Sequence, residues 1–175
     1  MVRGSPNPFH FGLPARLRKA RKQSGLKRAA LGLQVGRDSK VAANIEADQR
    51  IPTVRTVARL AAGVGVSASW LAFGLGDQHA DQQPATTDDM GARLQSVRIG
   101  LGLTKAALAR NLDLSATAVT NIENGAQTGV DVLEALAEAL GVSPAWLAYG
   151  EGPQVLPARR RARTTAAITD GADLR

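Results

Sequence analysis

Two short segments of the chain carry side chains that could do chemistry. The candidate residues are small or bear a hydroxyl, amide or ammonium group: Ser39, Lys40, Ala43 and Asn44 in the first segment, and Ala116, Thr117, Thr120 and Asn121 in the second. In each segment the first two and last two of these residues stand one turn apart, so they lie on one face of a helix. A helix in the major groove of DNA needs short side chains near the bases and donors that reach base edges. These residues therefore predict contacts to DNA bases.

Two of these assignments have an open alternative. Lys40 could contact guanine or phosphate, because most contacts in such interfaces go to phosphate and sugar. Asn44 and Asn121 could read adenine or form hydrogen bonds with their own backbone.

A second group of residues is basic and suits binding to the DNA backbone. The predicted phosphate contacts are Arg16, Arg18, Lys27, Arg28, Arg37 and Lys105. A further cluster near the end of the chain consists of Arg159, Arg160, Arg161 and Arg163. We interpret this cluster either as an arm that contacts DNA or as a solubilising tail.

Other classes of function find little support. The chain has no cysteine, and its two histidines lie far apart in the sequence, so no metal site is expected. No catalytic triad, paired carboxylates or phosphate-binding loop is found, so we predict a protein that is not an enzyme and has no cofactor. No motif for a small-molecule ligand is evident. No apolar run approaches the ~18 residues of a membrane span, and we expect a cytoplasmic, nucleoid-associated protein without membrane contact.

The elements that position these residues come from an internal repeat. Residues 15–76 correspond to residues 92–152 with a one-residue gap placed after Glu46 and Glu123. A repeat of this length is a small domain rather than a solenoid unit. Apolar periodicity, capping residues and glycine stops predict five helices in each copy. Helix 3 is expected to start at the cap Asp38 in the first copy and at Ser115 in the second.

The predicted fold is therefore all-α, with two tandem five-helix domains joined by a flexible linker. The expected divisions are an irregular N-terminal arm at 1–12, a basic domain at 13–76, a linker at 77–89, an acidic domain at 90–152 and a basic disordered tail at 153–175.

Several structural roles follow from residue type. Alanines are expected where helices 2 and 3 cross closely, at Ala29, Ala30, Ala106 and Ala107. Trp70 and Trp146 are expected to fill the cores, with a dimer contact as the alternative. Glu46 and Glu123 are expected to pair with an arginine, either at Arg16 and Arg93 or at Arg21 and Arg98.

Charge divides the two copies. Residues 1–77 hold 13 Lys and Arg against 4 Asp and Glu, a net charge of +9, whereas residues 78–155 hold 4 against 9, a net charge of −5. A basic first domain suits phosphate binding. We expect the acidic second domain to be repelled by a DNA backbone, which favours a role in dimerisation or partner binding.

Two segments of the second copy carry a family motif: Leu-Thr-Lys-Ala-Ala-Leu-Ala-Arg-Asn-Leu-Asp-Leu-Ser-Ala-Thr-Ala-Val-Thr-Asn-Ile-Glu-Asn-Gly at 103–125, and Gly-Val-Ser-Pro-Ala-Trp-Leu-Ala-Tyr-Gly at 141–150. Together they resemble the phage-repressor (Cro/repressor-type, or xenobiotic-response-element-type) helix-turn-helix family. The first copy is similar through residues 26–46 and 65–74. The resemblance implies DNA contacts from the start of helix 2 and the first turns of helix 3. The family often has Gln where this chain has Arg28 and Lys105. A cation at these positions favours contact with phosphate over contact with a base. Ala47-Asp48 replaces the usual Asn-Gly, so a different loop path is expected.

The resemblance implies a sequence-specific transcriptional regulator of double-stranded DNA, with repression as the favoured mode and activation as the open alternative. Two arrangements are open. In the favoured one, the second domain holds a homodimer whose first domains read a palindrome. In the other, both domains read one duplex, although about 14 flexible residues typically span only ~20 Å and successive major-groove faces lie ~34 Å apart. The runner-up functions are a low-specificity architectural DNA-binding protein and an antitoxin-like adaptor.

Overall fold

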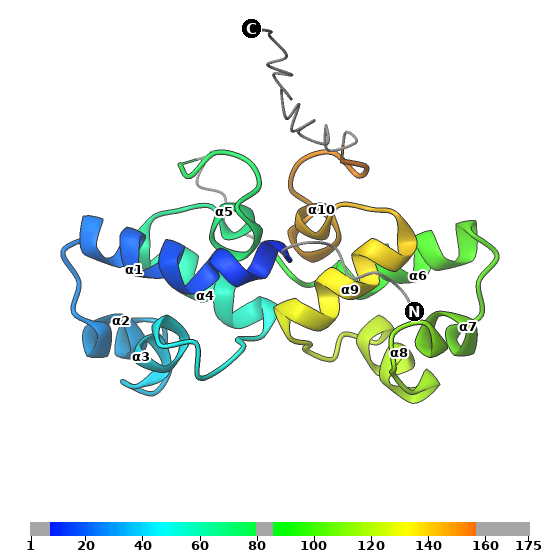
Figure 1. Cartoon of the computed structure of the whole chain (residues 1–175), viewed down its shortest axis with the longest axis horizontal. Coiled ribbons are helices and arrows are strands. Elements are labelled where there is room, and N and C mark those ends of the chain that lie inside the picture. Colours follow the sequence, from blue (N-terminus) through cyan, green and yellow to red (C-terminus); the bar gives the residue numbers. More distant parts are fainter. Residues whose placement is uncertain (1–7, 80–85, 157–175) are drawn as a thin grey trace, which may run out of the picture.

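The computed structural model describes residues 8–79 and 86–156. Figure 1 shows them as two similar helical halves side by side. The first half contains the 3-10 helix η1 (Phe9–Gly12) and helices α1 (Leu13–Gln23), α2 (Arg28–Gln34), α3 (Val41–Glu46), α4 (Val54–Val64) and α5 (Ala68–Phe73). The second contains α6 (Met90–Gly100), α7 (Lys105–Arg110), α8 (Ala116–Glu123), α9 (Val130–Leu140) and α10 (Pro144–Tyr149). The predicted all-α tandem fold is confirmed. No helix in this described part is both long and apolar enough to cross a membrane.

Capping residues set most helix boundaries where the sequence predicts them. The hydroxyl of Ser67 accepts a hydrogen bond from the Trp70 amide at the start of α5, and Ser143 does the same for α10. Gly65 and Gly141 follow α4 and α9 in the left-handed conformation, at φ 68° and 69°. These are the residue types that satisfy the unpaired backbone groups at helix ends.

The third helices of the two halves begin differently. Ser115 caps α8 through a hydrogen bond from the Ala118 amide to its hydroxyl, as expected. In the first half, the Asp38 carboxylate instead accepts the backbone N–H of Lys40 at 2.7 Å, and α3 begins only at Val41. The prediction that Asp38 caps the helix is therefore wrong, because this local turn uses the carboxylate. Ser39 and Lys40 lie before the helix rather than in it.

The close crossing of helices 2 and 3 in the first half depends on Gly32, which was not among the predicted residues. Ala29 and Ala30 are exposed, so their predicted role at the crossing is wrong. The buried residue there is Gly32, where an added Cβ would clash with the Asp38 carbonyl oxygen. The equivalent residue in the second half is Ala109, which is also buried.

The cores are aliphatic, with one large aromatic residue at the end of each half. Phe73 and Tyr149 are almost fully buried, at 1% and 4% exposure. Trp70 and Trp146 are only partly buried at the edge of the core, so they do not fill it as predicted. Lys19 covers the Trp70 ring, with its Nζ 5.7 Å from the ring centroid.

The two halves contact each other through a reciprocal pair of backbone hydrogen bonds. The Val54 amide donates to the Thr128 carbonyl at 3.0 Å, and the Val130 amide donates to the Pro52 carbonyl at 3.1 Å. Val54 and Val130 are equivalent positions of the repeat, as are Pro52 and Thr128. The contact is therefore self-complementary, like the interface of a two-fold dimer, but it is made within one chain.

Helices α5 and α10 form a second contact between the halves. The Phe73 and Tyr149 rings lie 6.4 Å apart between centroids. The Tyr149 hydroxyl donates to the Val54 carbonyl of the other half at 3.1 Å. Burial of this hydroxyl raises the pKa of Tyr149 well above its ordinary value. Helices α5 and α10 therefore pack against each other, and the two domains are in direct contact as well as being connected by the linker.

The arm preceding α1 also ties the halves together. The backbone amides of Phe9 and His10 donate to the Glu134 carboxylate at 2.6 and 3.0 Å, and His10 Nδ1 lies 2.7 Å from it. Glu134 belongs to α9 of the second half. Residues 9–12 form a short helix rather than an irregular segment, and the buried carboxylate accepts hydrogen bonds from its first two amides.

Candidate nucleic-acid interface

Helices α3 and α8 lie on the same face of the molecule. In Figure 1 both occupy the lower edge, on either side of the contact between the halves, with α2 and α7 beside them. Each helix 3 packs against its helix 2, as the contacts of α2 with α3 and of α7 with α8 show. The two helices that carry most of the predicted base-contacting residues therefore lie on one edge of the molecule.

In the first half, two of the four predicted base-contacting residues line a basic cleft of about 280 Å³ beside α3, whereas Ser39 and Ala43 do not. Lys40 lines the cleft from the turn before α3, and Asn44 lines it from the helix. Arg37 and Arg50 complete the basic wall and are both exposed. Sequence reasoning proposed Arg37 and missed Arg50, whose only signal was its charge in the loop after helix 3.

Arg50 stands where the first repeat has its extra residue. The Gln49 amide donates to the Asn44 carbonyl, and the Ala126 amide donates in the same way to Asn121. The loops therefore match up to Gln49, and the gap falls after it rather than after Glu46. Asp48 takes the left-handed conformation at φ 56°, as the equivalent Gly125 does at φ 93°. The prediction that Ala47-Asp48 changes the loop path is therefore wrong, because the two loops differ only after Gln49.

The corresponding face of the second half is neutral. Ala116, Thr117 and Asn121 are exposed along α8. The Thr120 hydroxyl donates to the Ala116 carbonyl at 3.0 Å, so it already has a partner within the helix. Thr117 stands where the first half has Lys40. The two faces therefore differ in charge at this position.

Three acidic residues of the second half lie away from the exposed face of α8. Glu123, the one acidic residue of α8, has only 1% of its side chain exposed and pairs with Arg98. Glu134 is held by the N-terminal arm, and Glu151 accepts a hydrogen bond from Ser67 in the first half. The net charge of −5 therefore does not describe the surface of α8.

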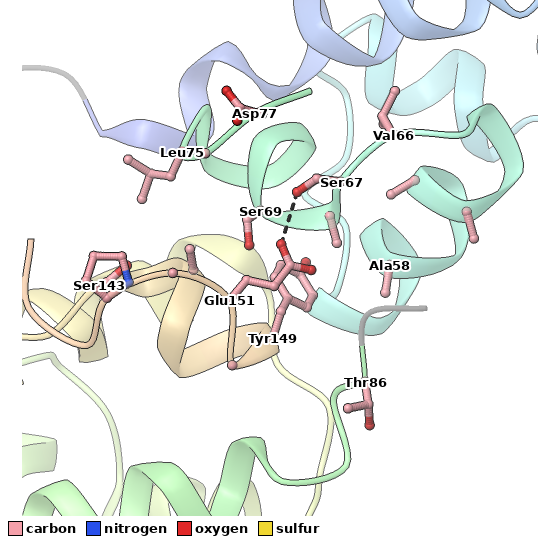
Figure 2. A pocket seen from close by; sticks show the side chains of 18 of the residues that line it. Ala58, Val66, Ser67, Ser69, Leu75, Asp77, Thr86, Ser143, Tyr149 and Glu151 are labelled. Carbon is pink, nitrogen blue, oxygen red and sulfur yellow. Dashed lines mark hydrogen bonds between the residues drawn. The ribbon is translucent and has the colours of Figure 1, made fainter. Parts of the chain in front are cut away.

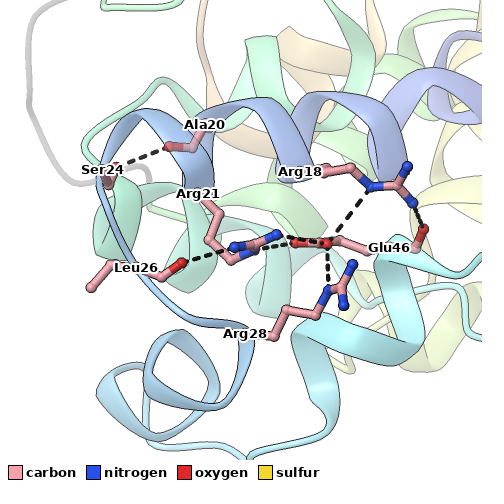
Figure 3. A network of polar contacts seen from close by, with 7 residues as sticks. All are labelled: Arg18, Ala20, Arg21, Ser24, Leu26, Arg28 and Glu46. Carbon is pink, nitrogen blue, oxygen red and sulfur yellow. Dashed lines mark hydrogen bonds and ion pairs between the residues drawn. The ribbon is translucent and has the colours of Figure 1, made fainter.

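The buried side chain of Glu46, at the end of α3, has three arginines around it (Figure 3). Arg21 Nε lies 2.5 Å from one Glu46 oxygen, and Arg28 Nε lies 2.8 Å from the other. Arg18 donates to the Glu46 carbonyl at 2.8 Å. Burial disfavours the charged form of Glu46, but the hydrogen bonds from Arg21 and Arg28 outweigh it and lower the pKa of this carboxyl. The network fixes α3 to α1 and α2.

The second half repeats this arrangement with fewer cations. Arg98 binds both Glu123 oxygens, at 2.6 and 3.2 Å, and Lys105 Nζ lies 3.4 Å from the carboxylate. The prediction that Arg21 and Arg98 pair with these glutamates is confirmed. Arg28 and Lys105 keep 52% and 35% of their side chains exposed and stay predicted phosphate contacts.

Arg16 has a different task from the one predicted. Its guanidinium donates to the carbonyls of Leu71 and Ala72 at 2.9 and 2.7 Å, and Arg93 does the same for Leu147 and Ala148. Burial lowers the pKa of Arg16 to about 10. The donors of Arg16 are thus used to close the end of α5 rather than being free for phosphate. The alternative prediction, that Arg16 and Arg93 pair with Glu46 and Glu123, is wrong, because those glutamates pair with Arg21 and Arg98.

The other predicted basic residues have separate positions. Arg18 is half exposed, and Lys27 is exposed immediately before α2. The cluster Arg159, Arg160, Arg161 and Arg163 lies outside the described residues. Arg18, Lys27 and Arg37 remain candidates for backbone contacts.

Comparison with known proteins gives one result that bears on this face. A family model described as helix-turn-helix matches the chain twice, at residues 17–71 and at residues 94–147. Each match begins in the first helix of one half and ends in its last helix. No solved structure matches the chain.

Proposed function

The chain belongs to the Cro/repressor-type helix-turn-helix family of DNA-binding transcriptional regulators, and we propose that one chain reads two half-sites of a single duplex. The observation that carries this proposal is that α3 and α8 lie on the same edge of the molecule, on either side of the contact between the halves. Dimeric regulators of this kind place two such helices in successive major grooves, about one helical turn apart. Here the second reading helix is supplied by the same chain.

The contact between the halves supports this arrangement. Reciprocal bonds at Val54 and Val130 fix the two domains near the axis that relates them. A dimer interface uses the same patch from each partner, and this chain provides both copies of that patch itself. The pairing within one chain takes the place of the homodimer expected from the sequence.

The two faces are proposed to contribute differently to binding. Arg37, Lys40 and Arg50 surround the cleft of the first half and suit phosphate binding, which dominates affinity. The neutral residues Thr117 and Asn121 suit contacts to base edges. The operator would then consist of two unlike half-sites, with the first domain supplying most of the dependence on salt.

The test is selection from a random duplex library with the full chain at physiological salt. We expect two unlike half-sites whose centres lie about 10 base pairs apart. Analytical ultracentrifugation should find one chain on each duplex. A symmetric palindrome bound by two chains would instead establish the homodimer, and no enrichment would favour an architectural or adaptor role.

Matched variants assign each half-site to its domain. Lys40→Ala should weaken binding by about 1–3 kcal/mol, with any change of preference confined to the first half-site. Thr117→Glu should cause a loss at the second half-site, because a carboxylate would approach the phosphates. Arg59→Ala is the control, since Arg59 is exposed on α4 outside the reading helices. If Thr117→Glu left affinity unchanged, the second domain would not contact DNA.

We also propose that the regulation is repression, as the family resemblance implies. A reporter with the selected site inside its promoter should lose expression when the chain is present. The Thr117→Glu variant should restore that expression. A rise in expression with the unaltered chain would identify an activator.

A further inference from the structure

A pocket of about 750 Å³ opens where the two halves meet, between α4 and α5 of the first half and α10 of the second (Figure 2). One wall is apolar and made of small residues of α4, chiefly Ala58, Ala61 and Ala62. Leu75 and Val66 also line the pocket. The volume is within the range of small-molecule sites, which are concave, mostly apolar and frequent at domain interfaces.

The repeat explains why the pocket is open on this side. Ala58 of α4 is equivalent to Glu134 of α9, which is covered by the amides of Phe9 and His10. The residue equivalent to Phe9 is Thr86, and it lines the pocket with a much smaller side chain. The site that the arm covers on one side of the molecule is therefore a cavity on the other.

The pocket contains a buried polar atom with no partner. Ser69 is 3% exposed, and its hydroxyl makes no hydrogen bond within the described structure. In Figure 2 its side chain points from α5 toward the Glu151 end of the pocket. The equivalent residue in the second half is Ala145, so the fold does not need a hydroxyl at this position. An unpartnered buried hydroxyl is rare in native proteins and suits a ligand that supplies the missing bond.

The charge of the lining is one-sided. Glu151 and Asp77 both line the pocket, whereas none of its described lining residues is Lys, Arg or His. Glu151 stands where the first half has Leu75, and the Ser67 hydroxyl holds it across the interface at 3.0 Å. A carboxylate fixed at the end of an apolar wall is complementary to a cation with a hydrocarbon body.

We propose that this pocket binds a small organic cation with an apolar body, of the alkylammonium class. The ammonium group lies at Glu151, with Ser69 available to a ligand donor or acceptor, and the hydrocarbon lies along the small residues of α4. The ligand touches both halves of the chain. This site is separate from the DNA-binding face and can be tested without DNA.

The experiment is isothermal titration calorimetry of the full chain with octyltrimethylammonium, octanol and octanoate. These probes share a chain length and differ in charge. We expect the cation to bind with one site per chain, and the neutral and anionic probes to bind at least about tenfold more weakly, because only the cation pairs with the carboxylates. Equal binding of all three probes would overturn the proposal.

Variants locate the site. Glu151→Gln and Glu151→Leu, the latter copying Leu75, should remove the preference for the cation. Ala62→Phe should block binding by filling the pocket from an exposed position of α4. Glu138→Gln is the control, because it makes the same charge change at an exposed position of α9 outside the pocket. Thermal unfolding verifies that each variant is folded.

One result would contradict the assignment. Unchanged cation binding by Ala62→Phe and Glu151→Gln, both folded, would place the cation elsewhere. Loss of binding in Ala62→Phe and loss of charge preference in Glu151→Gln, with Glu138→Gln unaffected, would establish the site.

Discussion

Single arginines in the first half differ in function according to burial. Arg16 and Arg21 are largely withdrawn from solvent and hold helices together through fixed acceptors. Arg37 and Arg50 are exposed beside α3 and are available to an external anion. The count of basic residues cannot separate these roles, whereas their burial and partners can.

Glu46 gives a prediction at this scale. Glu46→Gln should destabilise the protein by about 3 kcal/mol at neutral pH, because Arg21 would remain buried without its counter-charge. The folded-state pKa of Glu46 is lowered, so its contribution is present above the unfolded pKa of about 4.3 and is lost as pH falls through the lower folded value. Urea unfolding between pH 6 and pH 3 measures both effects.

The matched control for this prediction is Glu138→Gln. Glu138 is exposed and its replacement should change stability by less than about 0.5 kcal/mol. The Glu46→Gln variant should also show a weaker loss of stability with acid than the unaltered protein. Identical acid profiles for the unaltered protein and Glu46→Gln would mean that the Arg21 pair does not shift this titration.

At the scale of elements, the crossing of helices 2 and 3 depends on one small residue. Gly32 has no room for a Cβ beside the Asp38 carbonyl. Ala109 fills the equivalent place in the second half, where Ser115 caps α8. The two turns match as far as Gly36 and Asp113, which are both in the left-handed conformation, so the halves differ in how the third helix begins.

Gly32→Ala should therefore destabilise the first domain by about 1–3 kcal/mol through overpacking, despite the better helix propensity of alanine. The reverse change in the second domain, Ala109→Gly, should cost only about 1 kcal/mol from propensity together with a small lost contact. Chemical unfolding of both variants measures the difference. A gain in stability for Gly32→Ala would show that the turn relaxes easily.

Most of the helices were predictable because their signals are local. Caps such as Ser67 and stops such as Gly65 act within a few residues. The role of Arg50 was not predictable, since the repeat aligns almost equally well with its gap at several places in the loop after helix 3. Asp38 misled the prediction because a capping side chain can equally stabilise a turn before the helix.

At the scale of the whole molecule, the arrangement of the halves was beyond the sequence. Their reciprocal contact is made by backbone groups of Val54 and Val130, which leave no signal in side-chain type. The net charge of −5 led to the expectation that DNA repels the second domain. A net charge does not say on which side of a domain the acidic residues lie. Glu134 and Glu151 contribute to that sum while facing the first domain.

The N-terminal arm allows a prediction about the rigidity of this arrangement. Glu134→Ala should increase hydrogen exchange at the amides of Phe9 and His10, because their common acceptor is removed. Exchange in the core of α1, around Leu17, should change little, since those amides are bonded within the helix. Glu138→Ala serves as the control. Unchanged protection at residues 9–12 in Glu134→Ala would show that the arm is held by its apolar contacts.

The reciprocal bridge between the halves also bears on how the regulator responds to its own abundance. A repressor that must first assemble from two chains is inactive when dilute, and its occupancy of an operator rises steeply once the chains associate. In this protein, the two proposed reading helices are covalently joined and need no encounter. Operator occupancy should then follow the simple saturation curve of a one-to-one complex, with a Hill coefficient near 1. The gene it controls would be silenced gradually as the protein accumulates, without a threshold.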